Sequence, residues 1–131
     1  MSLESGIFEM VTGVPGVGAL IGSRLYPNFV PDDVAHPAGS YQIISRSSFK
    51  AHDGRVQLSR LLVQVNLFGK RYVELLAAIT SMEQTLQGFR GEAGGERFDE
   101  VQFSEGPGDY DEETEYHQVI GELLMIWRQG E

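Results

Sequence analysis

The sequence contains no cysteine and no long uninterrupted apolar run. The first absence excludes disulfides, iron–sulfur clusters and thiolate zinc sites. The second excludes a membrane-spanning helix, which needs about 18 or more consecutive apolar residues. The first residues also lack the basic region and apolar stretch of a signal peptide. We therefore expect a soluble protein without a membrane partner, which works where it is made or in a particle assembled there.

Basic residues are scarce in the C-terminal half. Residues 1–73 hold seven Lys and Arg against five Asp and Glu, whereas residues 74–131 hold three against fourteen, and the net charge is −9. Proteins that bind nucleic acid need clustered Lys and Arg to contact the phosphates. We therefore expect no specific nucleic-acid binding. The acidic half is either a solvated surface or the partner of the slightly basic half of another copy.

The 131 residues are typical of one globular domain, with 41% hydrophobic and 22% charged residues. Apolar periodicity predicts helices near residues 3–11 and over 70–86, and strands over 41–45, 55–68, 98–103 and 114–128. This order, α-β-β-α-β-β, predicts a single α+β domain over 1–131. We expect a mostly antiparallel four-stranded sheet with two main helices packed on one face. The helix stripe expected to face the sheet consists of Tyr72, Leu75, Leu76, Ile79, Met82 and Leu86.

The last predicted strand is apolar on both faces. One face carries Val119, Leu123, Met125 and Trp127, and the other carries Ile120, Leu124 and Ile126. A sheet covered by helices on one side should show polar residues on the other. Either both faces are covered within the chain, or another subunit covers one of them. The second possibility makes Ile120, Leu124 and Ile126 candidate subunit contacts.

A basic, polar segment separates the first two predicted strands. Residues 46–54 contain the turn signal Asp53-Gly54 and predict a long hairpin tip, which extends to residue 60. The segment is either a mobile surface loop or a contact arm that becomes ordered on a partner. As an arm, it would use an apolar anchor and basic groups. The candidate contact residues here are Phe49, Lys50, His52, Arg55 and Arg60.

Motifs for catalysis or metal binding are weak. The glycine-rich run at 13–22 lacks the Gly-Lys-Ser/Thr ending of a nucleotide-binding loop. The acidic run at 109–115 lacks the glycine and terminal glutamate of a calcium loop. His36, His52 and His117 are far apart and stand in no catalytic motif. We therefore expect no enzyme activity, no catalytic residues, no cofactor and no metal site.

Short motifs follow one another along nearly the whole chain in a distinctive order. They are Arg24-Leu-Tyr-Pro, Val30-Pro31, Pro37, Tyr41-Gln-Ile-Ile-Ser, Asp53-Gly54, Val63-Gln-Val-Asn-Leu-Phe-Gly, Tyr72, Gly88-Phe-Arg-Gly, Tyr110, Tyr116 and Ile126-Trp127-Arg128. This ordered set resembles the tail-completion proteins of long-tailed bacteriophages and prophages, which are similar to tail terminators. The chain departs from the pattern in its acidic 105–115 region and at Asn66 and Gly69.

The resemblance implies a structural, non-enzymatic subunit of a virion, assembled in the bacterial host cytoplasm. Such subunits form a ring, often a hexamer, that caps the tail tube and meets the head connector. The implied partners are further copies of the chain, the tail-tube protein and the head connector or neck proteins. Two alternatives remain open: another neck or adaptor subunit of the particle, or a small ligand-binding domain or enzyme.

Overall fold

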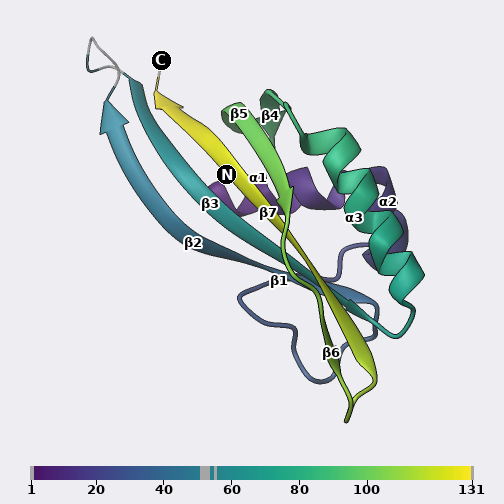
Figure 1. The fold of residues 1–131 in the computed structure, drawn as a ribbon. Helices are drawn as coiled ribbons and strands as arrows, with labels where there is room; N and C mark the ends of the chain where they lie inside the picture. Colours follow the sequence, from purple (N-terminus) through teal and green to yellow (C-terminus); the bar gives the residue numbers. More distant parts are fainter. Residues whose placement is uncertain (1, 51–53, 55, 131) are drawn as a thin grey trace.

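The computed structural model describes residues 2–50, 54 and 56–130 of the chain. Its helices are α1 (Leu3–Thr12), α2 (Pro15–Ile21) and α3 (Tyr72–Leu86). Its strands are β1 (Leu25–Pro27), β2 (Ala38–Lys50), β3 (Val56–Gly69), β4 (Gly91–Ala93), β5 (Glu96–Glu105), β6 (Asp109–Asp111) and β7 (Tyr116–Gly130). Long, curved strands form one layer, and the helices pack against one side of it (Figure 1).

The sheet is seven-stranded and mixed, with the order β1-β2-β3-β7-β5-β4 and with β6 paired to the N-terminal part of β7. Strand β1 runs parallel to β2, and the other pairs are antiparallel. The expectation of a four-stranded antiparallel sheet with two main helices is therefore wrong, although the chain is α+β. Strands β1, β4 and β6 have three residues each, which is too short for alternation to reveal them.

Strand β2 of the β2–β3 hairpin is longer than the sequence predicts. Strand β2 continues to Lys50, which pairs with Gln57. A bulge between Ile43 and Ser45 adds one residue to β2 and shifts the register of its outer half by one residue relative to β3. Residues 46–50 are exposed, so they show no alternation of apolar and polar types that would identify a strand. They belong to paired strands rather than to a long loop.

The hydrophobic core lies between the helices and alternate residues of the central strands. Leu61, Val63, Val65 and Leu67 of β3 are fully buried there, as is Leu123 of β7. Ser2 precedes helix α1, and its side chain accepts a hydrogen bond from the Ser5 amide and caps the first turn. None of the helices formed by the described residues is both long and apolar enough to cross a membrane.

Helix α3 faces the sheet with a stripe rotated slightly from the expected one. Leu75, Ile79 and Met82 are almost completely buried. Tyr72, expected in the stripe, is 44% exposed, and Leu76 only packs partly against the core. Tyr72 is the first residue of the helix and reaches the ring of His117 rather than the sheet core.

Candidate assembly surface

The face of the sheet opposite the helices carries the second apolar stripe of β7. Leu124 is 43% exposed, and Ile120 and Ile126 are half-buried. Successive residues of a strand point to opposite faces, so these three side chains lie on the side away from buried Leu123 and Met125. No helix among the described residues covers this side of β7 (Figure 1). We call it the helix-free face.

The hairpin end of the helix-free face is apolar. Leu62 of β3 pairs with Leu124 of β7, and Arg60 pairs with Ile126. Phe49 of β2 is 38% exposed, and the guanidinium carbon of Arg60 lies 5.2 Å from the centre of its ring. The cation covers part of the ring without removing it from solvent. This part of the face therefore combines open apolar area with a positive charge.

The predicted contact residues of the hairpin fall on both faces of it. Phe49 and Arg60 lie on the helix-free face, together with Leu124 and Ile126. Lys50 follows Phe49 directly in an extended strand and therefore points the other way. His52 and Arg55 lie outside the described residues. The predicted arm is thus a two-sided strand pair, with Phe49 and Lys50 on opposite sides.

A second basic side chain at the hairpin end of the sheet, that of Arg128, forms an ion pair with Asp99. Asp99 is the extra residue of a bulge in β5, between Phe98 and Glu100. Arg128 donates to both carboxylate oxygens of Asp99, with Nε at 3.0 and 2.8 Å and a terminal nitrogen at 2.7 Å. The hydrogen bond from Arg128 lowers the pKa of the Asp99 carboxyl, and Arg97, at 3.6 Å, adds to the effect. Arg128 is therefore held by Asp99, which it shares with Arg97, whereas Arg60 is stacked on the apolar area.

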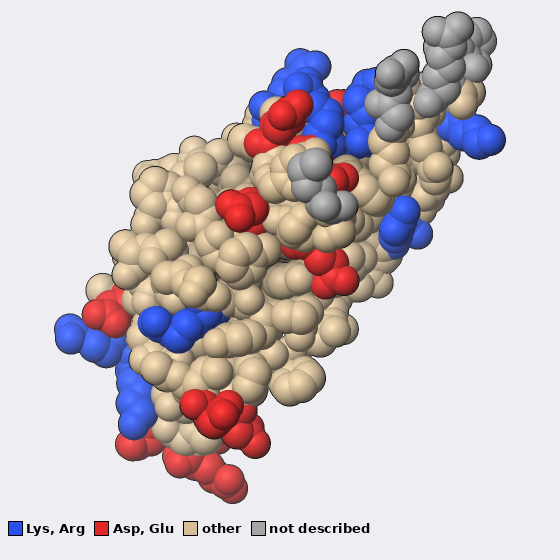
Figure 2. Space-filling view, turned by 180° about the vertical axis from the view of Figure 1, so that it is seen from behind, with Lys and Arg blue, Asp and Glu red and all other residues tan. Residues whose placement is uncertain are grey.

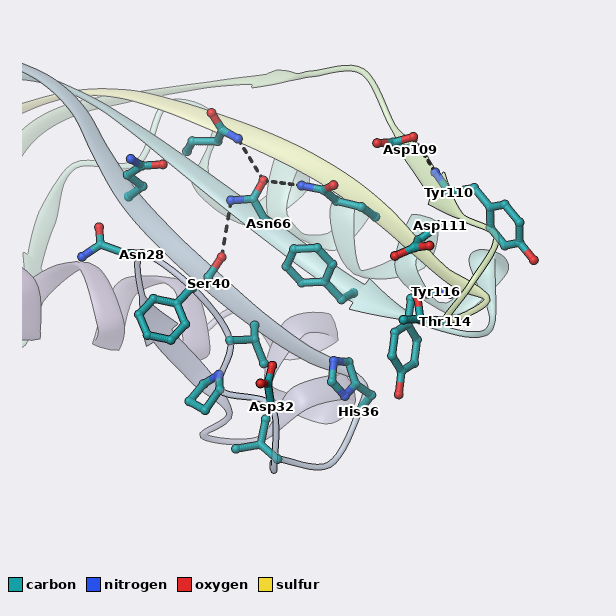
Figure 3. Close-up of a pocket in the computed structure, with 18 of the residues that line it drawn as sticks. Asn28, Asp32, His36, Ser40, Asn66, Asp109, Tyr110, Asp111, Thr114 and Tyr116 are labelled. Carbon is teal, nitrogen blue, oxygen red and sulfur yellow. Dashed lines mark hydrogen bonds between the residues drawn. The ribbon is translucent and has the colours of Figure 1, made fainter.

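The other end of the helix-free face is polar and hollowed. Asn66 of β3 accepts hydrogen bonds from the amides of Gln64 (2.9 Å) and Gln118 (3.0 Å), and its own amide donates to Ser40 (3.5 Å). Asn66 and Ser40 are buried, at 6% and 2% exposure. These side chains form the floor of a groove of about 920 Å³, whose walls are the 28–36 segment and the β6–β7 hairpin (Figure 3).

The rim of this groove is acidic. Its acidic lining residues are Asp32 on one wall and Asp109, Asp111 and Glu112 on the other, and no Lys or Arg stands among the described residues that line it. Lys70 lies at one end of the groove, 5.7 Å above the ring of Tyr116. The acidic run at 109–115 is therefore one wall of a groove, which analysis of the sequence missed. Polar Gln64, Asn66 and Gln118 within otherwise apolar strands are the signal that could have revealed its floor.

The histidines take part in aromatic contacts. His36 stacks on Tyr116 with ring centres 4.2 Å apart, and His117 contacts the rings of Tyr110 (4.6 Å) and Tyr72 (5.2 Å). Within residues 2–50, 54 and 56–130, no group of three or more His, Asp or Glu side chains is placed to hold a metal ion. The described histidines therefore belong to the walls near the groove.

Comparisons with known proteins match this chain by its fold. No family model and no curated protein matches the chain. Fourteen chains of solved structures match it. One of them, a chain in the virion of a native gene transfer agent particle, superposes with a TM-score of 0.59 and 12% identity. The match covers 98% of this chain and 96% of that chain, so the two share nearly their whole architecture.

Proposed function

We propose that this chain is a structural subunit of a phage-like virion, where it completes the tail tube and contributes to the joint between tail and head. The observation that carries the proposal is the likeness over nearly the whole chain to a component of a gene transfer agent virion. The order of motifs from Arg24 to Arg128 adds the tail-completion role through its resemblance to that family. The proposed role is structural and not enzymatic.

The helix-free face supports assembly with other chains. Leu124 and Phe49 expose apolar area on a sheet face that, in most single chains, would be polar. A contact there would bury Ile120, Leu124 and Ile126 against a neighbouring copy. We infer a closed ring, with six copies as the number that the resemblance implies. Its two sides would meet the tail-tube protein and the head connector.

The test is loss and restoration of the chain in the phage or prophage that encodes it. Without the chain, tails should have uncontrolled length or fail to join heads, as seen by electron microscopy of lysates. Supplying the intact chain should restore joined particles of uniform length. A matched pair of variants sharpens the test: Ile126→Lys should fail to restore them, whereas Glu83→Lys on exposed α3 should succeed. Joined particles of normal length in the absence of the chain would contradict the proposal.

A further inference from the structure

The β2–β3 arm and the groove carry opposite charges. We define the β2–β3 arm as the paired residues 46–50 and 56–60. Its charged residues are Arg46, Lys50 and Arg60, all basic and all exposed. The groove is lined by four carboxylates and by no Lys or Arg among the described residues. Figure 2 shows blue side chains near the hairpin tip, with some red ones among them, and both red and blue side chains at the far end of the molecule.

The two features cannot meet within one chain. Tyr110 on the groove wall pairs with His117, and Arg60 on the arm pairs with Ile126 of the same strand. At a rise of about 3.3 Å per residue, these two positions on β7 lie about 30 Å apart. The arm and the β6–β7 hairpin accordingly stand at opposite ends of the sheet (Figure 1). Any contact between them therefore joins two molecules.

We propose that the β2–β3 arm of one copy docks into the groove of the next copy. Because Phe49 and Lys50 point to opposite sides of the arm, each meets a different wall of the groove. Lys50 faces the carboxylates of the β6–β7 wall, and Phe49 packs on Phe29 of the opposite wall. Phe29 is available for this contact, since it lines the groove and is 70% exposed. The backbone edge that the arm offers belongs to β2, because β3 is paired with β7 on its other side.

This contact is head-to-tail, because each copy offers an arm at one end and a groove at the other. Head-to-tail contacts produce a ring when the rotation between neighbours closes, and a filament when it does not. That these contacts close into a ring rests on the proposed function. The docking itself concerns two copies of this chain and can be tested with purified protein.

Cross-linking tests the docking directly, and a chain without cysteine allows single thiols to be placed freely. A tagged Lys50→Cys chain is mixed with an untagged Asp111→Cys chain at rising concentration under mild oxidation. We expect mixed disulfide dimers in at least fivefold excess over those formed by Lys50→Cys with Glu83→Cys, whose thiol lies on exposed α3. Equal yields from the two mixtures would overturn the inference.

Charge exchange is the second test. Lys50→Glu and Asp111→Lys should each weaken self-association about tenfold in sedimentation at low salt, because each places like charges at the contact. The double variant, Lys50→Glu with Asp111→Lys, should recover association because every contact again joins opposite charges. Lys50→Glu with Glu83→Lys has the same net charge and should not recover. Recovery in both double variants, or in neither, would overturn the inference.

The outcomes separate this inference from the proposed function. If the arm docks on the tail tube instead, Lys50→Cys should cross-link only to the tube protein, and the inference fails while the function stands. If copies cross-link as proposed but particles without the chain are normal, the function fails and the docking stands.

Discussion

The hydroxyl of Tyr41 in β2 donates a 2.9 Å hydrogen bond to the carboxylate of Glu4 in α1. The phenol is only 5% exposed, and the bond joins the first helix to the sheet. Burial, together with the neighbouring carboxylate, raises the pKa of Tyr41 to about 12. The neutral phenol is therefore a structural element of the folded chain.

Because the pKa of Tyr41 is raised in the folded chain, the free energy of unfolding should fall at high pH. Above pH 10 an unfolded tyrosine loses its proton, while the folded Tyr41 keeps it up to about pH 12. The unfolded state then binds fewer protons, so stability decreases as pH rises through this window. We expect a loss of about 2–3 kcal/mol, corresponding to two pKa units. Urea unfolding between pH 8 and 12 measures it.

The matched variant Tyr41→Phe isolates the effect. It should lower stability at pH 8 by about 1–2 kcal/mol, because the Glu4 carboxylate loses its donor. Its alkaline loss should be smaller than that of the unchanged chain. The same alkaline slope in both proteins would show that Tyr41 does not titrate in this way.

The bidentate pair of Asp99 and Arg128 should stabilise the bulge in β5 at neutral pH. Because the folded pKa of Asp99 is lowered, its contribution is present above the ordinary carboxyl pKa and is lost as pH falls through the folded value. Asp99→Asn should cost about 1 kcal/mol at pH 7, a modest amount because both side chains are partly exposed to solvent. Chemical denaturation at pH 7 and at pH 3 should show the difference shrinking in acid.

Arg128→Lys is the control for geometry, since it keeps the charge but cannot make the paired contact. Arg128→Lys should lower the free energy of unfolding by most of the amount that Asp99→Asn lowers it. Full stability in the lysine variant would show that charge alone accounts for the pair.

Two neighbouring leucines of α3, Leu75 and Leu76, differ in burial, so their alanine variants can be compared directly. Leu75→Ala should cost about 2–5 kcal/mol, because Leu75 is fully buried and its removal leaves a cavity. Leu76→Ala should cost clearly less, about 1 kcal/mol, because Leu76 is half-buried and part of its area stays in water. Thermal and urea unfolding of the two variants measures both losses. Equally large losses would support the stripe expected from the sequence, which contains both leucines.

The helix-free face should matter more to assembly than to folding. Leu124→Glu and Ile126→Lys should reduce self-association at least tenfold, since central apolar residues dominate contacts between subunits. Their melting temperatures should change little, because Leu124 is 43% exposed in the single chain. Light scattering after size exclusion measures the first quantity and calorimetry the second. Unfolding of both variants would assign these residues to the core.

The long strands could be predicted from the sequence, and the short ones could not. Alternation of Leu61, Val63, Val65 and Leu67 identifies β3 because its helix-facing side is apolar from Leu61 to Leu67. Residues 46–50 of β2 show no such alternation, because both of their sides meet solvent. Strands of three residues, such as β6, depend on pairing with β7 rather than on any pattern of their own.

Of the candidate site, the apolar stripe of β7 could be predicted from the sequence and the groove could not. Ile120, Leu124 and Ile126 were expected on one face of the last strand, and the structure places them together on the helix-free face. The groove was not expected, because its walls come from residues 28–36 and 109–114, which are far apart in the chain. Only its floor, with Asn66 opposite Ile120 in register, belongs to a strand with a readable pattern.

Strand β7 lies between β3 and β5, yet it is the last of the described strands to be synthesised. Until β7 emerges from the ribosome, β3 lacks one neighbour and β5 lacks its main one, so both expose unpaired edges. Such edges are templates for wrong pairing with other nascent chains. The sheet therefore closes late, by inserting its central strand into a gap between elements already made. This order of synthesis delays the helix-free face, with Ile120, Leu124 and Ile126, until translation has passed residue 130.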